Sequence, residues 1–135
     1  MGIGHTRWAT HGKPELKNAH PHIDGSGTIA VVQNGIIENF QDLKNKLEKE
    51  GIIFNSDTDT EVIPHLIKRE LNTLSKLNLE NNGSTLLVAV RNVISDLEGS
   101  YALAVLWADA PTSLVVARRQ AVSYTHLRAH ETVRN

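Results

Sequence analysis

The chain has 135 residues, the length of one ordinary domain, and 40% of them are hydrophobic, so global disorder is not expected. Its 14 lysines and arginines against 15 aspartates and glutamates argue against nucleic acid or an anionic membrane as a partner. No apolar run nears the ~20 residues of a membrane helix. The absence of cysteine excludes disulfides, thiolate metal sites and a cysteine nucleophile within this chain. Because no secretory signal opens the sequence, we expect a cytoplasmic protein.

The N-terminal quarter of the chain predicts loops followed by one strand. Residues 1–27 are rich in Gly, His and Thr and lack apolar periodicity, which is typical of loops around a short strand and of the wall of a site. Residues 28–37 are a β-branched run, typical of a buried strand, interrupted by Asn34-Gly35. Because Asn-Gly is a strong turn signal, the strand is predicted to turn sharply there and then continue.

Three helices are predicted next. Apolar residues at helical spacing indicate a first helix between a capping Asn39 and a terminating Gly51, and Ile52 to Phe54 are expected to form a short strand. A run of acidic and hydroxyl side chains follows, and it leads into a second helix rich in Val, Ile and Leu.

Capping signals set the ends of the later helices. Thr58 and Glu61 match the capping-box pattern at the start of the second helix. Residues 72–83 are polar and predict a loop, after which Ser84 is expected to cap a third helix that ends at Gly99.

Two strands complete the predicted order. Residues 101–108 are apolar, residues 109–111 form a turn, and residues 114–117 are the expected hairpin partner. A strand, three helices and two strands predict mixed α and β layers, an α+β fold without internal repeats.

The last stretch, residues 122–135, follows neither a helical nor a strand period. A frayed terminus would explain this. The run Ser-Tyr-Thr-His-Leu-Arg-Ala-His-Glu-Thr also resembles translated sequencing-adapter read-through, which is the interpretation that we favour. We therefore expect one partial domain at 1–121 and a non-native tail at 122–135.

Two segments contain side chains suited to binding a free amino acid and its reacting amide. The Arg7 guanidinium could bind a carboxylate bidentately with help from the Thr10 hydroxyl, although Arg7 and Trp8 could equally form a surface cation–π pair. Asn34 and Gly35 could form an oxyanion hole from one side-chain amide and one backbone N–H, but taken alone they favour a turn.

Acidic and histidine residues allow weaker hypotheses. Asp57 and Asp59 could hold a ligand ammonium, yet helix capping alone would justify both acids. A metal site built on His20 and His22 lacks a clear third ligand, so no metal is expected.

Four segments occur in an order that is specific to one family. They read Gly2-Ile-Gly-His-Thr-Arg-Trp-Ala-Thr-His-Gly12, Asn18-Ala-His-Pro-His22, Asn34-Gly-Ile-Ile-Glu-Asn39 and Ser56-Asp-Thr-Asp-Thr-Glu-Val62. Over residues 1–121 the chain closely resembles the glutaminase domains of the isomerising glutamine–fructose-6-phosphate aminotransferases, which are class II amidotransferases. The Thr-Arg-Trp-Ala-Thr-His-Gly run is very specific, since purine-pathway relatives carry a different version of it.

This resemblance implies a role for each candidate residue. The contacts to the α-carboxylate of glutamine would be Arg7 and Thr10, with His11 beside them. Asp59 would take the α-ammonium group, and Asn34 and Gly35 would form the oxyanion hole through a side chain and a backbone N–H. Trp8 would gate the passage of ammonia, and His20 would line the same site.

The resemblance also implies a fold and a reaction. The fold would be the four-layer α/β/β/α sandwich of N-terminal-nucleophile hydrolases, here incomplete because the opening strand is missing. The parent enzyme would hydrolyse glutamine and pass ammonia to fructose 6-phosphate, forming glucosamine 6-phosphate. Fructose 6-phosphate would bind to sugar-phosphate isomerase domains that are missing here. A homo-oligomeric parent without a cofactor is expected.

Two departures from the family pattern bear on activity. The family's nucleophile is an N-terminal cysteine, whereas this chain has none, so we expect it to be inactive alone as a glutaminase. Gln33 stands where the family usually has histidine, which changes the local hydrogen bonding. The alternatives are another class II amidotransferase and a non-catalytic glutamine-binding module.

Overall fold

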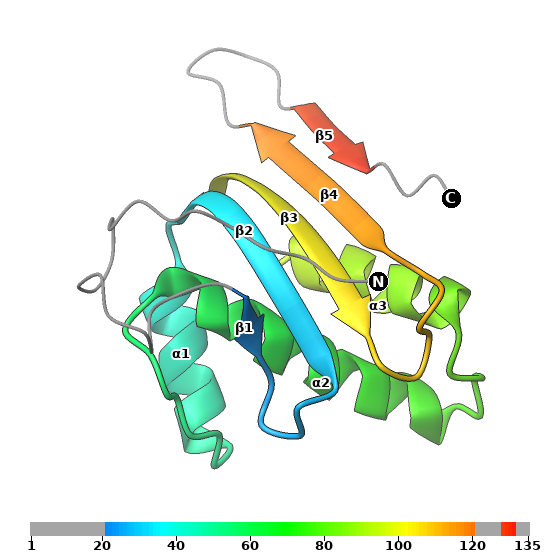
Figure 1. Cartoon of the computed structure of the whole chain (residues 1–135). Coiled ribbons are helices and arrows are strands. Elements are labelled where there is room, and N and C mark those ends of the chain that lie inside the picture. Colours follow the sequence, from blue (N-terminus) through cyan, green and yellow to red (C-terminus); the bar gives the residue numbers. More distant parts are fainter. Residues whose placement is uncertain (1–20, 121–127, 132–135) are drawn as a thin grey trace.

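The computed structural model describes residues 21–120 and 128–131, which form one antiparallel sheet covered on one face by helices (Figure 1). The strands lie in the order β1-β2-β3-β4-β5: β1 (His22–Ile23), β2 (Ile29–Ile37), β3 (Gly99–Trp107), β4 (Val115–Gln120) and β5 (Arg128–Glu131). The helices are α1 (Phe40–Lys49), the short 3₁₀ helix η2 (Asp59–Glu61), α2 (Val62–Lys76) and α3 (Gly83–Ile94).

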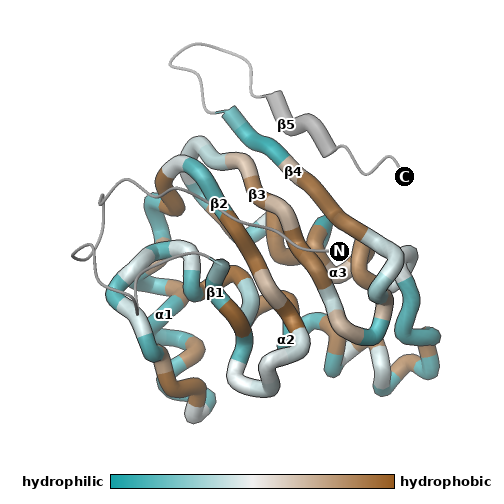
Figure 2. Tube along the Cα trace, in the orientation of Figure 1, coloured by the Kyte–Doolittle hydropathy of each residue, from teal (hydrophilic) through white to brown (hydrophobic). Residues whose placement is uncertain are grey.

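The core lies between the sheet and the helices. In β2 and β3 the odd-numbered side chains, such as Val31 and Val105, are fully buried, while even-numbered ones such as Val32 and Ala104 are half-exposed on the opposite face. This alternation follows from the two-residue period of a strand. The central strands are accordingly apolar along most of their length (Figure 2).

The expected α+β class is confirmed, and the described residues show one sheet and one helix layer of the expected sandwich. The first helix and the β3–β4 hairpin also occur where the apolar spacing places them. Asn39 precedes α1 as expected, but its side chain does not cap the helix. It donates to the Asp96 carbonyl (2.8 Å) and accepts from the Glu98 N–H (3.0 Å), which ties the start of α1 to the loop before β3.

Several local predictions are wrong. Residues 52–54 form no strand, and α2 extends to Lys76 because Leu74 continues its buried face into the predicted loop. The N-cap of α3 is Asn82, whose side chain accepts from the Thr85 N–H (3.0 Å). The helix ends at Ile94, and Gly99 begins β3 instead of ending the helix.

Residues 128–131 form a strand although their sequence lacks a strand pattern. β5 pairs antiparallel with β4, from Ala117 opposite Glu131 to Gln120 opposite Arg128. Backbone groups on an edge strand can pair with almost any extended segment, so this pairing needs no side-chain pattern. Whether 122–135 is a non-native tail stays a prediction.

No helix in the described part of the chain is long and apolar enough to cross a bilayer.

Candidate active site

The candidate oxyanion residues lie near the end of β2. The pairing of β2 with β3 is bracketed by two backbone hydrogen bonds of 2.8 Å, from Ala108 N to Thr28 O and from Glu38 N to Glu98 O. Even-numbered residues of β2 therefore bond to β3, and odd-numbered ones direct their N–H groups the other way. On that other side, β1 pairs only with Ala30 and Val31 among the described residues. The N–H of Gly35 consequently points to a side of β2 that β1 does not reach.

The predicted turn at Asn34-Gly35 is wrong, because β2 runs unbroken through both residues. A glycine is nevertheless required at this place. Gly35 has a φ of 115°, and a Cβ there would lie 2.3 Å from the Ser100 carbonyl oxygen and 2.8 Å from the Tyr101 Cα. The close approach of β3 thus explains the glycine, where the sequence suggested a reversal of the chain.

Asp59 is brought to the same end of β2 from elsewhere in the chain. The residue is 3% exposed, and its Oδ2 accepts from the N–H of Ile37 (2.7 Å). Gly35 precedes Ile37 by two residues, about 7 Å along a strand. Asp59 thus bonds to β2 two residues after Gly35, and Asn34, which precedes Gly35 on the strand, is exposed.

Gln33 also connects β2 to the segment that carries Asp59. Its side chain is buried on the helix side of the sheet, and its Oε1 accepts from the Thr60 hydroxyl (2.5 Å). The residue that departs from the family pattern therefore still forms a side-chain hydrogen bond to η2, directly beside Asp59.

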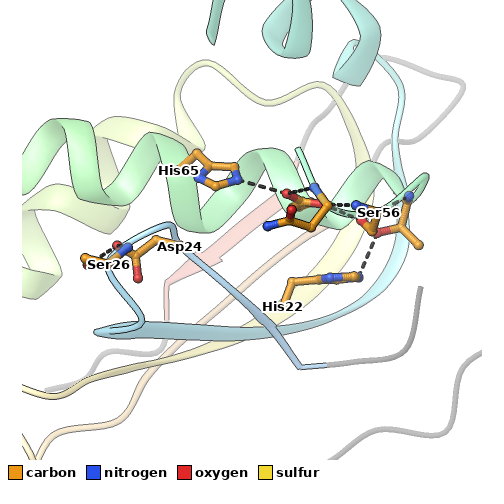
Figure 3. Close-up of polar contacts among 8 residues, drawn as sticks. His22, Asp24, Ser26, Ser56 and His65 are labelled. Carbon is orange, nitrogen blue, oxygen red and sulfur yellow. Dashed lines mark hydrogen bonds and ion pairs between the residues drawn. The ribbon is translucent and has the colours of Figure 1, made fainter. Parts of the chain in front are cut away.

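Glu61 belongs to a buried polar network that the sequence patterns do not predict. Figure 3 labels Ser56, His65 and His22 of this network. The residue is 2% exposed. Its carboxylate accepts from Asn55 N (2.9 Å) and from both the N–H (2.6 Å) and the hydroxyl (2.5 Å) of Ser56. Its Oε2 lies 3.0 Å from His65 Nε2. The predicted capping box is wrong, because Glu61 bonds to residues before Thr58. The spacing of Glu61 and His65, four residues apart on a helix, was the one available signal.

The network holds Glu61 in its charged form. Burial alone would raise its pKa, but hydrogen bonds from His65, Ser56 and Asn55, together with the charge of His65, outweigh burial and lower the pKa to about 2. The pKa of Asp24 is also lowered, where hydrogen bonds from Ser26, Ile29 and Thr28 outweigh its burial. Asp24 lies at the turn between β1 and β2, on another part of the sheet edge.

The folded chain should lose stability in acid, chiefly through Glu61. Its pKa falls from an ordinary 4.5 to about 2 on folding, so its contribution is complete above about pH 5 and is lost as the pH falls towards 2. That contribution is roughly 3 kcal/mol at neutral pH. The free energy of unfolding of the full chain, measured with urea across this pH range, should change less steeply with pH in Glu61→Gln. The dependence that remains in this variant should come from Asp24. The exposed-residue control Glu48→Gln should keep the original slope. An unchanged slope in Glu61→Gln would contradict this assignment.

The other predicted site residues stand as follows. His22 is buried, and its Nε2 lies 2.7 Å from the Thr58 hydroxyl, while Asp57 is exposed. No group of three potential metal ligands occurs in the described ranges. The candidates in the N-terminal segment lie outside the described residues: Arg7, Trp8, Thr10, His11 and His20.

The structure is similar to two solved enzyme structures. The glutamine phosphoribosylpyrophosphate amidotransferase of B. subtilis matches with a TM-score of 0.62 and 32% identity, over 84% of this chain and 22% of that chain. A structure described as the allosteric regulatory enzyme of purine biosynthesis matches with a TM-score of 0.64, also at 32% identity, over the same shares of the two chains. The fold is therefore that of the N-terminal-nucleophile hydrolases, as expected.

The family model of the glutamine amidotransferase domain matches residues 5–127, and the chain belongs to this family. Curated relatives include the isomerising glutamine–fructose-6-phosphate aminotransferases of Thermosynechococcus vestitus (56% identical over 121 residues) and Methanosarcina acetivorans (53% over 121 residues). These alignments cover 90% and 88% of this chain but only 18% and 19% of the relatives. The chain thus spans less than a fifth of the length of these relatives. The resemblance to glutamine–fructose-6-phosphate aminotransferases that its motifs indicated is confirmed.

Proposed function

We propose that this chain is part of the glutamine-hydrolysing domain of an aminotransferase that makes glucosamine 6-phosphate from fructose 6-phosphate. The observation that supports the proposal is the buried Asp59 carboxylate, which accepts from the Ile37 N–H two residues after the candidate oxyanion residue Gly35. It is supported by relatives at 53–56% identity that are named isomerising glutamine–fructose-6-phosphate aminotransferases. We further propose that the parent protein is cytoplasmic and homo-oligomeric and needs no cofactor for glutamine hydrolysis.

The chemistry of glutamine explains why these groups belong together. The buried Asp59 carboxylate would bind the α-ammonium group at one end of the substrate, and Arg7, Thr10 and His11 would bind the α-carboxylate. Binding both charged groups fixes the side-chain amide in one place. Attack on that amide produces a tetrahedral oxyanion, which two preorganised donors, the Asn34 amide and the Gly35 N–H, would stabilise.

The steps around this oxyanion need groups from outside the described residues. The family's nucleophile is a cysteine and this chain has none, so the group that attacks the amide carbon would come from a part of the parent protein beyond this sequence. Ammonia released from the amide would pass Trp8, with His20 lining the site, towards the part that binds fructose 6-phosphate. The absence of cysteine also favours a second candidate, a glutamine-binding module without catalysis.

A chimera tests the proposal. Residues 1–121 of this chain replace the matching segment of the Thermosynechococcus vestitus relative, which supplies the missing parts of the enzyme. Glutamate release and glucosamine 6-phosphate formation are then measured in the chimera. The amidotransferase proposal predicts both products, whereas a segment suited only to binding would give a folded chimera that binds glutamine without hydrolysing it.

Within this chimera, Asp59→Asn should weaken glutamine binding. Removing the negative charge beside the α-ammonium group is expected to lower kcat/KM by roughly 10- to 100-fold, mainly through KM, as for the loss of a charge-assisted hydrogen bond. The matched control is Asp42→Asn, because Asp42 is exposed on α1. If both variants gave the same KM for glutamine, Asp59 would not be the ammonium-binding residue.

A further inference from the structure

Two acids of η2, Asp59 and Glu61, are both almost fully buried, but they differ in how their oxygens are used. An ionised carboxylate offers about four acceptor positions. Those of Glu61 are taken up by donors of its own chain, from Asn55, Ser56 and His65. Among the described residues, Asp59 receives one donor, the Ile37 N–H. Glu61 is thus occupied structurally, and Asp59 is the acid with capacity to bind a ligand.

The Glu61 network holds the chain on both sides of Asp59. Before Asp59, Glu61 binds the backbone and hydroxyl of Ser56, whose Oγ lies 3.2 Å from the Thr58 hydroxyl. After Asp59, it contacts His65 on α2. Thr58 extends the network to His22 of β1, and Figure 3 shows His65 and Ser56 on opposite sides of the network with His22 beneath Ser56. One buried carboxylate therefore connects β1, the segment 55–58 and α2.

We propose that Glu61 is a positioning residue that fixes the Asp59 carboxylate against the end of β2, and thereby sets the affinity for the α-ammonium group of glutamine. This inference rests on the function proposed for Asp59. Glu61 itself would not touch the substrate. Because Asp59 bonds to Ile37, two residues after Gly35, a shift of the 55–61 segment would move the ammonium-binding acid relative to the oxyanion hole.

Replacing Glu61 by glutamine tests this network, because it changes the hydrogen-bonding groups and keeps the size of the side chain. Glu61 Oε1 accepts from Ser56 N (2.6 Å) and from Asn55 N (3.2 Å), and Oε2 accepts from Asn55 N (2.9 Å). A glutamine side chain has one oxygen and one NH₂ group, so either orientation sets the NH₂ against a backbone N–H. Glu61→Gln therefore removes the charge and sets an NH₂ group against at least one backbone N–H, which weakens the hold on segment 55–58 with almost no change in shape. Glu48→Gln, at an exposed position of α1, is the matched control.

Amide hydrogen exchange on the full chain is the first test. In Glu61→Gln we expect the amides of Asn55, Ser56 and Ile37 to exchange at least 10-fold faster, while that of Leu103, in the middle of β3, changes much less. An equal increase in exchange rate at all four amides would mean that the variant is destabilised as a whole. An unchanged exchange rate at the Ile37 amide would mean that Glu61 does not hold Asp59. Either result would overturn the proposal. If Glu61→Gln fails to fold, Ser56→Ala, which removes the hydroxyl contacts to Glu61 and Thr58, is subjected to the same comparison.

A substrate comparison in the chimera separates this inference from the function on which it rests. Glutaramate is glutamine without its α-ammonium group, so the ratio of kcat/KM for glutamine to that for glutaramate reports ammonium recognition. Asp59→Asn and Glu61→Gln are both expected to lower this ratio at least 10-fold, and Glu48→Gln should leave it unchanged. An unchanged ratio in Asp59→Asn would overturn the proposed function. A lowered ratio in Asp59→Asn with an unchanged one in Glu61→Gln would overturn only the positioning role.

Discussion

Replacing Asn34 by alanine is expected to lower kcat for glutamine hydrolysis in the chimera by roughly 10²–10³-fold, with little change in KM. The Asn34 amide would meet negative charge that exists only after attack on the substrate amide, so its loss affects the transition state more than substrate binding. The backbone of Asn34 is paired with Ala102 in the sheet, which gives the side chain a fixed origin. Steady-state glutamate release measures the effect.

A second substitution of Asn34 and a control variant test whether the loss of kcat comes from the oxyanion contact. Asn34→Asp keeps the shape of the side chain but sets a negative charge beside the developing oxyanion, so its kcat should fall at least as far as that of the alanine variant. Asn45→Ala removes an exposed amide of α1 and should leave kcat unchanged. A kcat for Asn34→Ala within about twofold of the unmodified chimera would contradict the oxyanion role.

Gly35→Ala is expected to have the largest effect on stability. Its φ of 115° strains any residue with a Cβ, at about 1–3 kcal/mol. The new Cβ would also meet the Ser100 carbonyl oxygen at 2.3 Å, and relieving such a contact costs about 1–3 kcal/mol more. The free energy of unfolding of the full chain should therefore fall by roughly 2–6 kcal/mol, and Tm by about 10 °C or more.

The matched control for Gly35 is Gly25→Ala. A Cβ at Gly25 would have no atom within 4 Å, so this variant should unfold within about 0.5 kcal/mol of the original chain. Thermal and urea unfolding of the two variants can be compared directly. Equal unfolding free energies for Gly35→Ala and Gly25→Ala would show that β3 does not require a glycine in β2.

Local sequence patterns predicted the elements whose causes are themselves local. The apolar spacing of α1 and the hydrophobic run of β3 depend on neighbours within a few residues, and both elements occur where expected. The turn at Asn34-Gly35 failed because the turn preference of a dipeptide is weaker than pairing along the whole of β3. What makes Gly35 necessary is Ser100, 65 positions later, and no local pattern contains that contact.

The roles of the candidate site residues stay predictions. The acid at Asp59 and the donors at Asn34 and Gly35 came from resemblance to a family, and the structure shows Asp59 bonded to Ile37, two residues after Gly35. The network of Glu61 was missed because its partners are backbone N–H groups and a hydroxyl, which leave little trace in sequence. The assignments of Arg7, Thr10 and the other N-terminal candidates stay predictions.

Glutamate release by the chimera tests the central claim most directly. If residues 1–121 contain the glutamine-binding acid and the oxyanion hole, the chimera should release glutamate from glutamine well above background, and Asn34→Ala should remove nearly all of this activity. A chimera that unfolds cooperatively like the parent enzyme but releases no glutamate would contradict the assignment of this chain to glutamine hydrolysis.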